Sequence, residues 1–138
     1  MNRSTLMAVI VVVVFVTCLT FSWGPALHAQ QTGAKRTILT KQDLSNCPAH
    51  EGVVAQVEFT PGAREPRHTH PGDIFGYVQE GTLTLSVGGS PIATVKPGEV
   101  FFVPAGKAHW AENAGETPVK VLATFVVEKG KPLTSPVQ

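Results

Sequence analysis

Three histidines in two separated segments carry the strongest chemical signal of this chain. His68 and His70 stand at positions i and i+2, and His109 closes the later run Pro104-x-Gly106-x-x-His109. Side chains at i and i+2 of a β-strand point to the same face. A third imidazole from another strand would complete a facial metal site, with ligand distances of about 2.0–2.2 Å and open positions opposite the protein. An isolated H-x-H pair is more often an ordinary surface pair, so the surrounding sequence must decide.

Short strands between Gly and Pro turns must position these histidines. Apolar and polar residues alternate in 53–59 and 82–87, which is typical of half-buried strands. Further strands are expected at 74–79, 91–95, 100–103 and 119–127. No window of eleven or more residues keeps an apolar repeat of 3.6 residues, so no helix is expected. The pattern predicts an all-β sandwich or barrel made by a single domain.

Residues 62–113 resemble the two sequence motifs of the cupin superfamily. The first motif runs glycine, five residues, H-x-H, three or four residues, glutamate, six residues, glycine. The second runs glycine, five residues, P-x-G, two residues, histidine, three residues, asparagine. The matching positions are Gly62, His68, His70, Gly81, Gly98, Pro104, Gly106, His109 and Asn113. The resemblance implies a cupin jelly-roll β-barrel in which the three histidines hold one divalent transition metal ion.

Position 74 departs from the first motif, because Ile74 stands where the family has a metal-binding glutamate. Isoleucine cannot coordinate a metal. Asp73 is a candidate replacement, but a shift of one residue on a strand turns a side chain to the opposite face unless a bulge redirects it. We therefore expect a three-histidine site, which resembles the sites of thiol dioxygenases and β-diketone-cleaving dioxygenases. Three neutral ligands would leave the full charge of the dication, which favours anionic ligands.

Other residues near the motifs are weaker candidates for the substrate pocket or for contacts to the ligands. The aromatic candidates are Tyr77, Phe75 and Phe102, whose alternative role is packing in the barrel core. The polar candidates are Glu65, Arg67 and Asn113. A charged residue such as Glu65 could orient an imidazole or hold a substrate carboxylate, although charges of this kind are more often solvated.

The two ends of the chain are expected to lie outside the barrel, which is assigned to residues 45–128. Residues 1–29 have a positive start, an apolar run and a small residue at the end, the layout of a secretory signal peptide. An uncleaved membrane anchor is the alternative, since the run is short for a membrane span. Residues 30–44 are expected to form a polar arm and 129–138 a C-terminal tail. The protein is thus expected to be exported, either periplasmic or secreted, or held at the membrane by its leader.

Charge and cysteine content limit the partners. The leader contains Arg3 and no acidic residue, so its removal from a chain with 11 basic and 10 acidic residues leaves a formally neutral protein. No nucleic acid is expected without a basic stripe, and no membrane contact beyond the possible anchor. Cys47 is the one cysteine outside the leader, so no intrachain disulfide is expected. Three roles of Cys47 stay open: an unreactive small residue, a reactive thiol, or a bridge to another molecule. Association is expected, since sheet edges need cover, and the resemblance to cupins implies a homodimer built from such edges.

Three functions remain open at this stage. The first is a metal-dependent oxygenase of small molecules, and the second is a non-catalytic module that binds a metal or a small-molecule ligand. The third, a sugar isomerase or epimerase, is weaker because no proton-transfer pair is evident. The metal could be Fe, Mn, Zn, Cu or Ni. The affinity order favours copper, zinc or nickel in a protein that takes its metal outside the cytoplasm, whereas the oxygenase relatives typically use iron.

Overall fold

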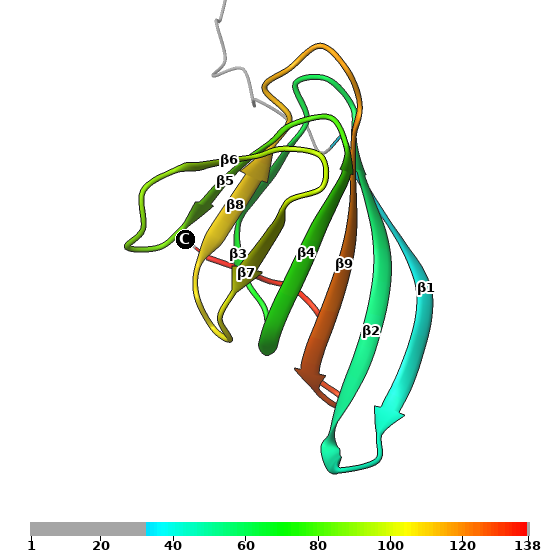
Figure 1. Ribbon diagram of the computed structural model, residues 1–138. Helices are drawn as coiled ribbons and strands as arrows, with labels where there is room; N and C mark the ends of the chain where they lie inside the picture. Colours follow the sequence, from blue (N-terminus) through cyan, green and yellow to red (C-terminus); the bar gives the residue numbers. More distant parts are fainter. Residues whose placement is uncertain (1–32, 138) are drawn as a thin grey trace, which may run out of the picture.

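Two five-stranded antiparallel sheets enclose one core in the computed structural model, which describes residues 33–137 (Figure 1). The first sheet has the order β1-β2-β9-β4-β7 and the second the order β10-β3-β8-β5-β6. The strands are β1 (Ala34–Leu44), β2 (Cys47–Phe59), β3 (Arg64–Thr69), β4 (Gly72–Glu80), β5 (Leu83–Val87), β6 (Ala93–Val95), β7 (Val100–Val103), β8 (His109–Glu112), β9 (Val119–Glu128) and β10 (Ser135–Pro136). The described residues contain no helix, so the all-β prediction is confirmed.

The core lies between the two sheets. Every second residue of β2 and β9 points into it, as the two-residue period of a strand predicts. The buried apolar residues of these strands are Val53, Ala55, Val57, Phe59, Val119, Val121, Ala123, Phe125 and Val127. The opposite sheet adds Leu83, Leu85 and Ala111. The alternation seen in the sequence at 53–59 and 82–87 therefore marks the inner faces correctly.

The chain crosses from the second sheet to the first immediately after the H-x-H pair, at Pro71-Gly72. A Cβ atom on Gly72 would lie 1.9 Å from the carbonyl oxygen of Val126. No side chain can approach a backbone so closely, so only glycine fits where β4 begins beside β9. This close approach holds His70 at the seam between the sheets.

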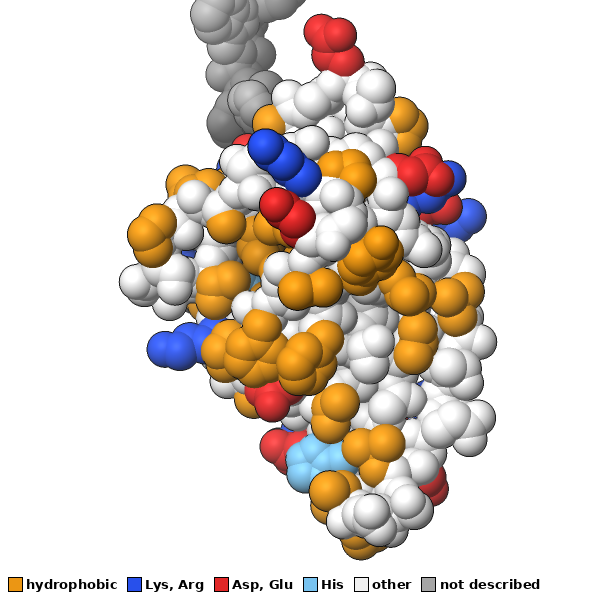
Figure 2. Space-filling model, viewed as in Figure 1, with side chains coloured by type: hydrophobic (Ala, Val, Ile, Leu, Met, Phe, Trp, Pro, Cys, Tyr) orange, Lys and Arg blue, Asp and Glu red, His pale blue; other side chains and the backbone are white. Residues whose placement is uncertain are grey.

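The outer face of β4 and β7 carries apolar side chains. Phe75 is 53% exposed and Phe102 is 47% exposed, and their ring centroids lie 5.0 Å apart across the two strands. Tyr77 and Val100 extend the same exposed group. Figure 2 shows hydrophobic side chains gathered over these two strands. This face is separate from the core, which lies on the other side of the sheet.

The polar arm predicted at 30–44 is wrong for residues 34–44, which form the edge strand β1. Along its length β1 pairs with β2, and the hairpin turns at Ser45-Asn46. The sequence conceals this strand because most of its side chains are exposed and Arg36, one of the less exposed, is charged. Without apolar alternation the strand depends on backbone hydrogen bonds, which almost any residue can make.

Part of the C-terminal tail predicted at 129–138 belongs to the barrel. Ser135 and Pro136 form β10, which pairs with the end of β3. The amide of Val137 donates to the carbonyl of Arg67 at 3.1 Å. A two-residue strand that contains proline gives no periodic signal in a sequence. The segment pairs with the strand that carries His68.

The predicted leader falls on residues that the structure does not describe. Residues 1–29, together with the choice between signal peptide and anchor, lie outside the range 33–137. Within that range no helix has the length and apolar character needed to span a membrane. The leader interpretation therefore stays a prediction.

Candidate metal centre

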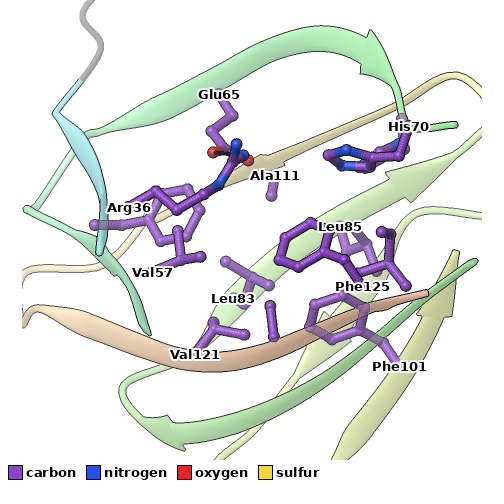
Figure 3. Close-up of a pocket in the computed structure, with 14 residues that line it drawn as sticks. Arg36, Val57, Glu65, His70, Leu83, Leu85, Phe101, Ala111, Val121 and Phe125 are labelled. Atoms are coloured by element: carbon purple, nitrogen blue, oxygen red, sulfur yellow. Dashed lines mark hydrogen bonds and ion pairs between the residues drawn. The ribbon is translucent and has the colours of Figure 1, made fainter. Parts of the chain in front are cut away.

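A small cavity lies between the two sheets and has mostly apolar walls. Its volume is about 40 Å³. Figure 3 shows Phe125 and Phe101 among the apolar side chains that line it, together with His70 and the pair Arg36 and Glu65. A space of this size admits a few water molecules or a small ligand.

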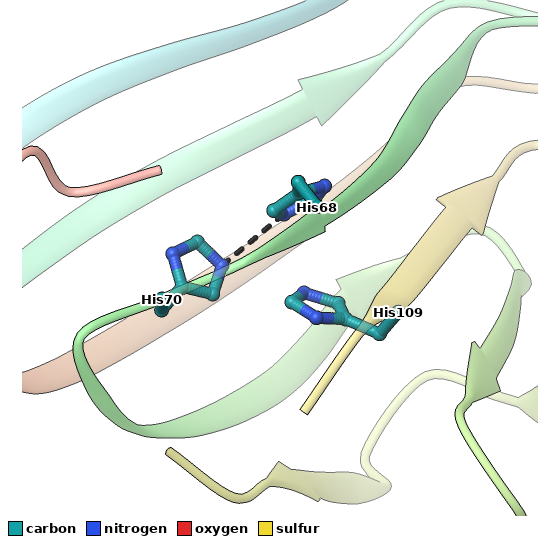
Figure 4. A group of neighbouring side chains, drawn as sticks. All are labelled: His68, His70 and His109. Carbon is teal, nitrogen blue, oxygen red and sulfur yellow. Dashed lines mark hydrogen bonds between the residues drawn. The ribbon is translucent and has the colours of Figure 1, made fainter. Parts of the chain in front are cut away.

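The three motif histidines converge on one another (Figure 4), and two of them, His70 and His109, line this cavity. His68 lies on β3 and faces His109 of β8 directly across the ladder, while His70 follows the end of β3. The ring centroids of His68 and His109 lie 4.2 Å apart, and that of His70 lies 4.8 and 5.0 Å from them. All three side chains are buried. The tertiary structure therefore brings together the three residues that the spacing singled out.

Backbone carbonyls fix which nitrogen of each ring is free. Each Nδ1 lies within hydrogen-bond distance of a carbonyl oxygen, which can only accept, so each Nδ1 carries the proton and donates it. The acceptors are Pro66 for His68 at 2.7 Å, Leu133 for His70 at 2.5 Å and Lys107 for His109 at 3.1 Å. A neutral imidazole then presents its Nε2 lone pair. Metal-binding histidines are held in this way in many proteins.

The free nitrogens of His68 and His70 face one another at a distance that suits a shared cation, and the ligand atoms of all three histidines lie within 4.8 Å of one another. Nε2 of His68 lies 3.2 Å from Nε2 of His70, the contact dashed in Figure 4. Two ligand atoms about 2.1 Å from one ion, at cis or tetrahedral angles, lie roughly 3.0–3.4 Å apart. Two lone pairs at 3.2 Å repel each other unless a cation lies between them. The donor set therefore fits a divalent transition metal.

Burial keeps the histidines neutral and ready to bind. Loss of solvation lowers the pKa of His70 from 6.5 to about 3, and the bond to the Leu133 carbonyl offsets only part of this effect. Burial also lowers the pKa of His109 from 6.5 to about 4, and the neighbouring His68 adds to the shift. Protons therefore compete weakly with a metal for these two rings at neutral pH.

Ile74 and Asp73 lie on opposite faces of β4, as a regular strand requires. Ile74 is 3% exposed and lines the cavity beside the histidines. Asp73 points elsewhere, and its Oδ1 accepts a hydrogen bond from the amide of Ala105 at 2.9 Å. The candidate role of Asp73 as a ligand is therefore wrong, because no bulge turns its side chain inward.

Three aromatic candidates lie on the outside of the barrel. Phe75, Tyr77 and Phe102 belong to the exposed outer face of β4 and β7, where they line a surface hollow. They therefore contact neither the cavity beside the histidines nor the core. Along β4 and β7 these outward-facing residues alternate with inward-facing ones, and both sets include apolar residues. The sequence therefore does not show which face is the inner one. Phe101, between the two faces, lines the cavity.

The polar candidates divide differently. Glu65 lines the cavity. Arg67 is exposed and lies outside the cavity lining, beside Pro136. Asn113 is 1% exposed, and its amide group donates to the carbonyls of Phe59 and Thr117. Its role is to close a loop, so its assignment to the pocket is wrong.

Two residues of the site have no signal in the motifs. Arg36 of β1 lines the cavity and places its guanidinium over the ring of Phe125, 5.5 Å from the centroid. Leu133 contributes only its carbonyl, which fixes His70. Arg36 lies in a segment whose sequence predicts a polar arm, and a backbone carbonyl leaves no signal in a sequence pattern.

The fold and the histidine cluster define a small β-barrel protein with a candidate metal site, and comparisons with known proteins specify the family. The cupin-domain family profile matches residues 55–127, so the chain belongs to the cupin family, and the cupin jelly-roll prediction is confirmed. Germin-like protein 1 of Brassica napus is 36% identical over 91 residues, covering 59% of this chain and 44% of the relative. The tetracenomycin polyketide synthase protein TcmJ of Streptomyces glaucescens is 33% identical over 94 residues, covering 67% of this chain and 60% of the relative.

Solved structures give the same family relationship. A recombinant oxalate oxidase in complex with glycolate superimposes with a TM-score of 0.61 at 25% identity, covering 78% of this chain and 57% of that one. A protein with a double-stranded β-helix domain from Klebsiella pneumoniae, at 19% identity and a TM-score of 0.61, shares the fold and covers 76% and 84%. This chain spans about half the length of the curated relatives it matches, 44% for the germin-like protein and 60% for TcmJ.

The lowered pKa values predict an acid-sensitive apoprotein. Below pH 6.5 the unfolded chain takes up protons on His70 and His109 that the folded chain excludes down to about pH 3 and 4. Stability should therefore fall on acidification through this window, by about 1.4 kcal/mol per pH unit and histidine at most. Urea unfolding of metal-free protein between pH 6.5 and 4.5 measures the slope. His109→Gln should make it shallower, and equal slopes in both proteins would contradict the assignment.

The inward position of Ile74 predicts that a carboxylate there would join the site. Ile74→Glu should raise zinc affinity about tenfold or more, because it adds a charged oxygen ligand to three neutral nitrogens. Competition with a chromophoric chelator measures the affinity. Phe75→Glu is the matched control, since it adds the same charge on the outer face of the same strand. An equal gain from both variants would show that only net charge matters.

Proposed function

We propose that this cupin is an exported, metal-dependent oxygenase of small molecules that uses His68, His70 and His109 as its metal ligands. The observation that carries the proposal is the convergence of the Nε2 atoms, with 3.2 Å between those of His68 and His70, beside a cavity. A structural metal site would be closed by a fourth protein ligand. Here Ile74 stands at the position of the family's glutamate, so three protein ligands leave the remaining coordination positions open to ligands from the cavity.

The residues of the chain divide the work of such a site. The three imidazoles hold the ion in a fixed orientation, because each ring is tied to a backbone carbonyl. A transition metal held there would supply Lewis acidity and, for iron, manganese or copper, redox chemistry. Nitrogen donors suit zinc and nickel as well, so the donor set alone does not choose among the five metals. The apolar walls exclude bulk water from the reacting groups.

The relatives support oxidative chemistry at this kind of site. Oxalate oxidase 2 of Hordeum vulgare is 32% identical over 98 residues, covering 63% of this chain and 44% of the relative. The oxalate oxidase structure with glycolate shows that a related barrel binds a small molecule. Proteins of one fold can catalyse different reactions. The oxygenase proposal for this chain is therefore tested by measuring oxygen turnover.

A non-catalytic module that binds a metal or a small ligand is the second candidate. Two observations favour it: the apolar Ile74 where the family has glutamate, and a cavity of only about 40 Å³. Such a protein would bind its metal and ligand without consuming oxygen. Export is proposed for either function, on the leader pattern at residues 1–29.

Oxygen uptake separates the two candidates. Metal-loaded protein should consume oxygen with at least one member of a panel of small thiols, β-diketones, phenolics, flavonols and glycolate. His109→Ala should abolish uptake and bound metal together, because it removes one of three ligands. His50→Ala, which changes a histidine outside the cluster, should retain both. Metal and ligand binding without oxygen uptake across the panel would establish the binding module instead.

We further propose that two copies associate through the exposed outer face of β4 and β7. An exposed aromatic group beside the edge strand β7 is typical of interaction surfaces. Light scattering should show a dimer, and Phe75→Ser with Phe102→Ser should convert it to a monomer. Ile38→Ser with Leu39→Ser, which removes two exposed apolar residues from β1, should leave the dimer intact. A monomeric wild type would contradict this proposal.

A further inference from the structure

An ion pair forms the polar part of the cavity wall. Nη2 of Arg36 lies 3.2 Å from Oε1 of Glu65, and Nη1 of Arg36 donates to the hydroxyl of Thr134 at 2.9 Å. The Nε atom of Arg36 is buried and has no hydrogen-bond partner among the described residues, so Glu65 and Thr134 alone hold the guanidinium by hydrogen bonds. The guanidinium is thus held by its own neighbours, and its charge is offset by Glu65.

The second oxygen of Glu65 is directed toward the metal centre. Its Oε2 lies 3.9 Å from Nε2 of His68, too far for a hydrogen bond but close to a proposed ligand atom. The Glu65 side chain is 19% exposed and lines the cavity. Glu65 is the only acidic residue among those of the described chain that line the cavity.

The distance fits an indirect contact with the ion. Two ligand atoms cis to each other on one metal lie about 3 Å apart. An oxygen bound cis to His68 would thus lie about 3 Å from Nε2, within reach of a hydrogen bond of about 2.7 Å to Glu65. Glu65 does not join the three histidines as a fourth ligand in this structure, because its oxygens lie outside the cluster of converging atoms.

We propose that Glu65 sets the ligand preference of the open metal positions, an inference that rests on the proposed three-histidine metal site. Its Oε2 accepts a hydrogen bond from a hydroxyl or water bound there and repels a second carboxylate. The ligand class is a hydroxyl-bearing small molecule with at most one carboxylate. Arg36 is a positioning residue, because it holds Glu65 in this orientation. Position 74 on β4 holds an isoleucine, so Glu65 of β3 supplies the carboxylate that faces the centre.

Glycolate and oxalate are the probes that separate these effects. Both offer one carboxylate to a metal, but the other end is a hydroxyl donor in glycolate and a second carboxylate in oxalate. The protein is loaded with Co²⁺, whose visible spectrum reports ligand binding, and each probe is titrated. In Glu65→Gln the ratio of the two Kd values should move at least about tenfold toward oxalate, since a hydrogen bond to a charged group is lost and a repulsion is removed.

Two further variants control for an unpaired buried charge and for a change in net charge. Arg36→Leu with Glu65→Leu removes the whole ion pair without leaving a buried charge alone, and it should shift the ratio in the same direction. Glu112→Gln removes an acidic residue paired with Arg64 outside the cavity lining and should leave the ratio unchanged.

The outcomes distinguish this inference from the site on which it rests. Bound Co²⁺ with an unchanged ratio in both Glu65 variants would overturn the role of Glu65 and leave the three-histidine site standing. An equal shift in Glu112→Gln would overturn it too, since net charge alone would then explain the effect. A wild type that binds no Co²⁺ would overturn the metal site itself, and this inference with it.

Discussion

The close approach of two unprotonated imidazole nitrogens is the constraint on which the rest of this structure depends. His68 and His70 place their Nε2 atoms 3.2 Å apart in a buried setting, where neither can turn away because its Nδ1 is bound to a carbonyl. Such an arrangement costs free energy unless a cation neutralises the facing lone pairs. The barrel therefore holds its histidines in the geometry of a metal complex, and the neutral state that burial enforces is the state that binds metal.

Several elements that lie far apart in the chain position the three histidines. The glycine at the crossing from β3 to β4 keeps His70 at the seam of the sheets, the ladder of β3 and β8 sets His68 against His109, and the C-terminal segment supplies the carbonyl for His70. Each element is individually weak. Together they fix the rings, because each ring is held by its own backbone at one end and by the hydrogen bond of its Nδ1 to a carbonyl at the other.

Loss of the family glutamate changes the electrostatics of the centre without removing the site. Ile74 fills the inner position with a methyl-rich side chain, so three neutral donors face the ion. The carboxylate that remains at the cavity is that of Glu65, which is paired with Arg36 and lies outside the coordination cluster. A carboxylate placed there acts on what binds to the metal more than on the metal itself, which links the departure from the motif to ligand choice.

The sequence determined the parts of this protein that depend on local spacing. The two-residue alternation identified the inner strands, and the two motifs identified the three histidines and the family, because both follow from periodicity and from glycine-dependent turns. Only the tertiary structure decided what depends on distant contacts. It placed Arg36 and Leu133 in the site, moved Phe75, Tyr77 and Phe102 to the outer face, and made strands of residues 34–44 and 135–136. Backbone pairing at an edge and the choice between two apolar faces leave no mark in side-chain pattern, so the sequence could not decide them.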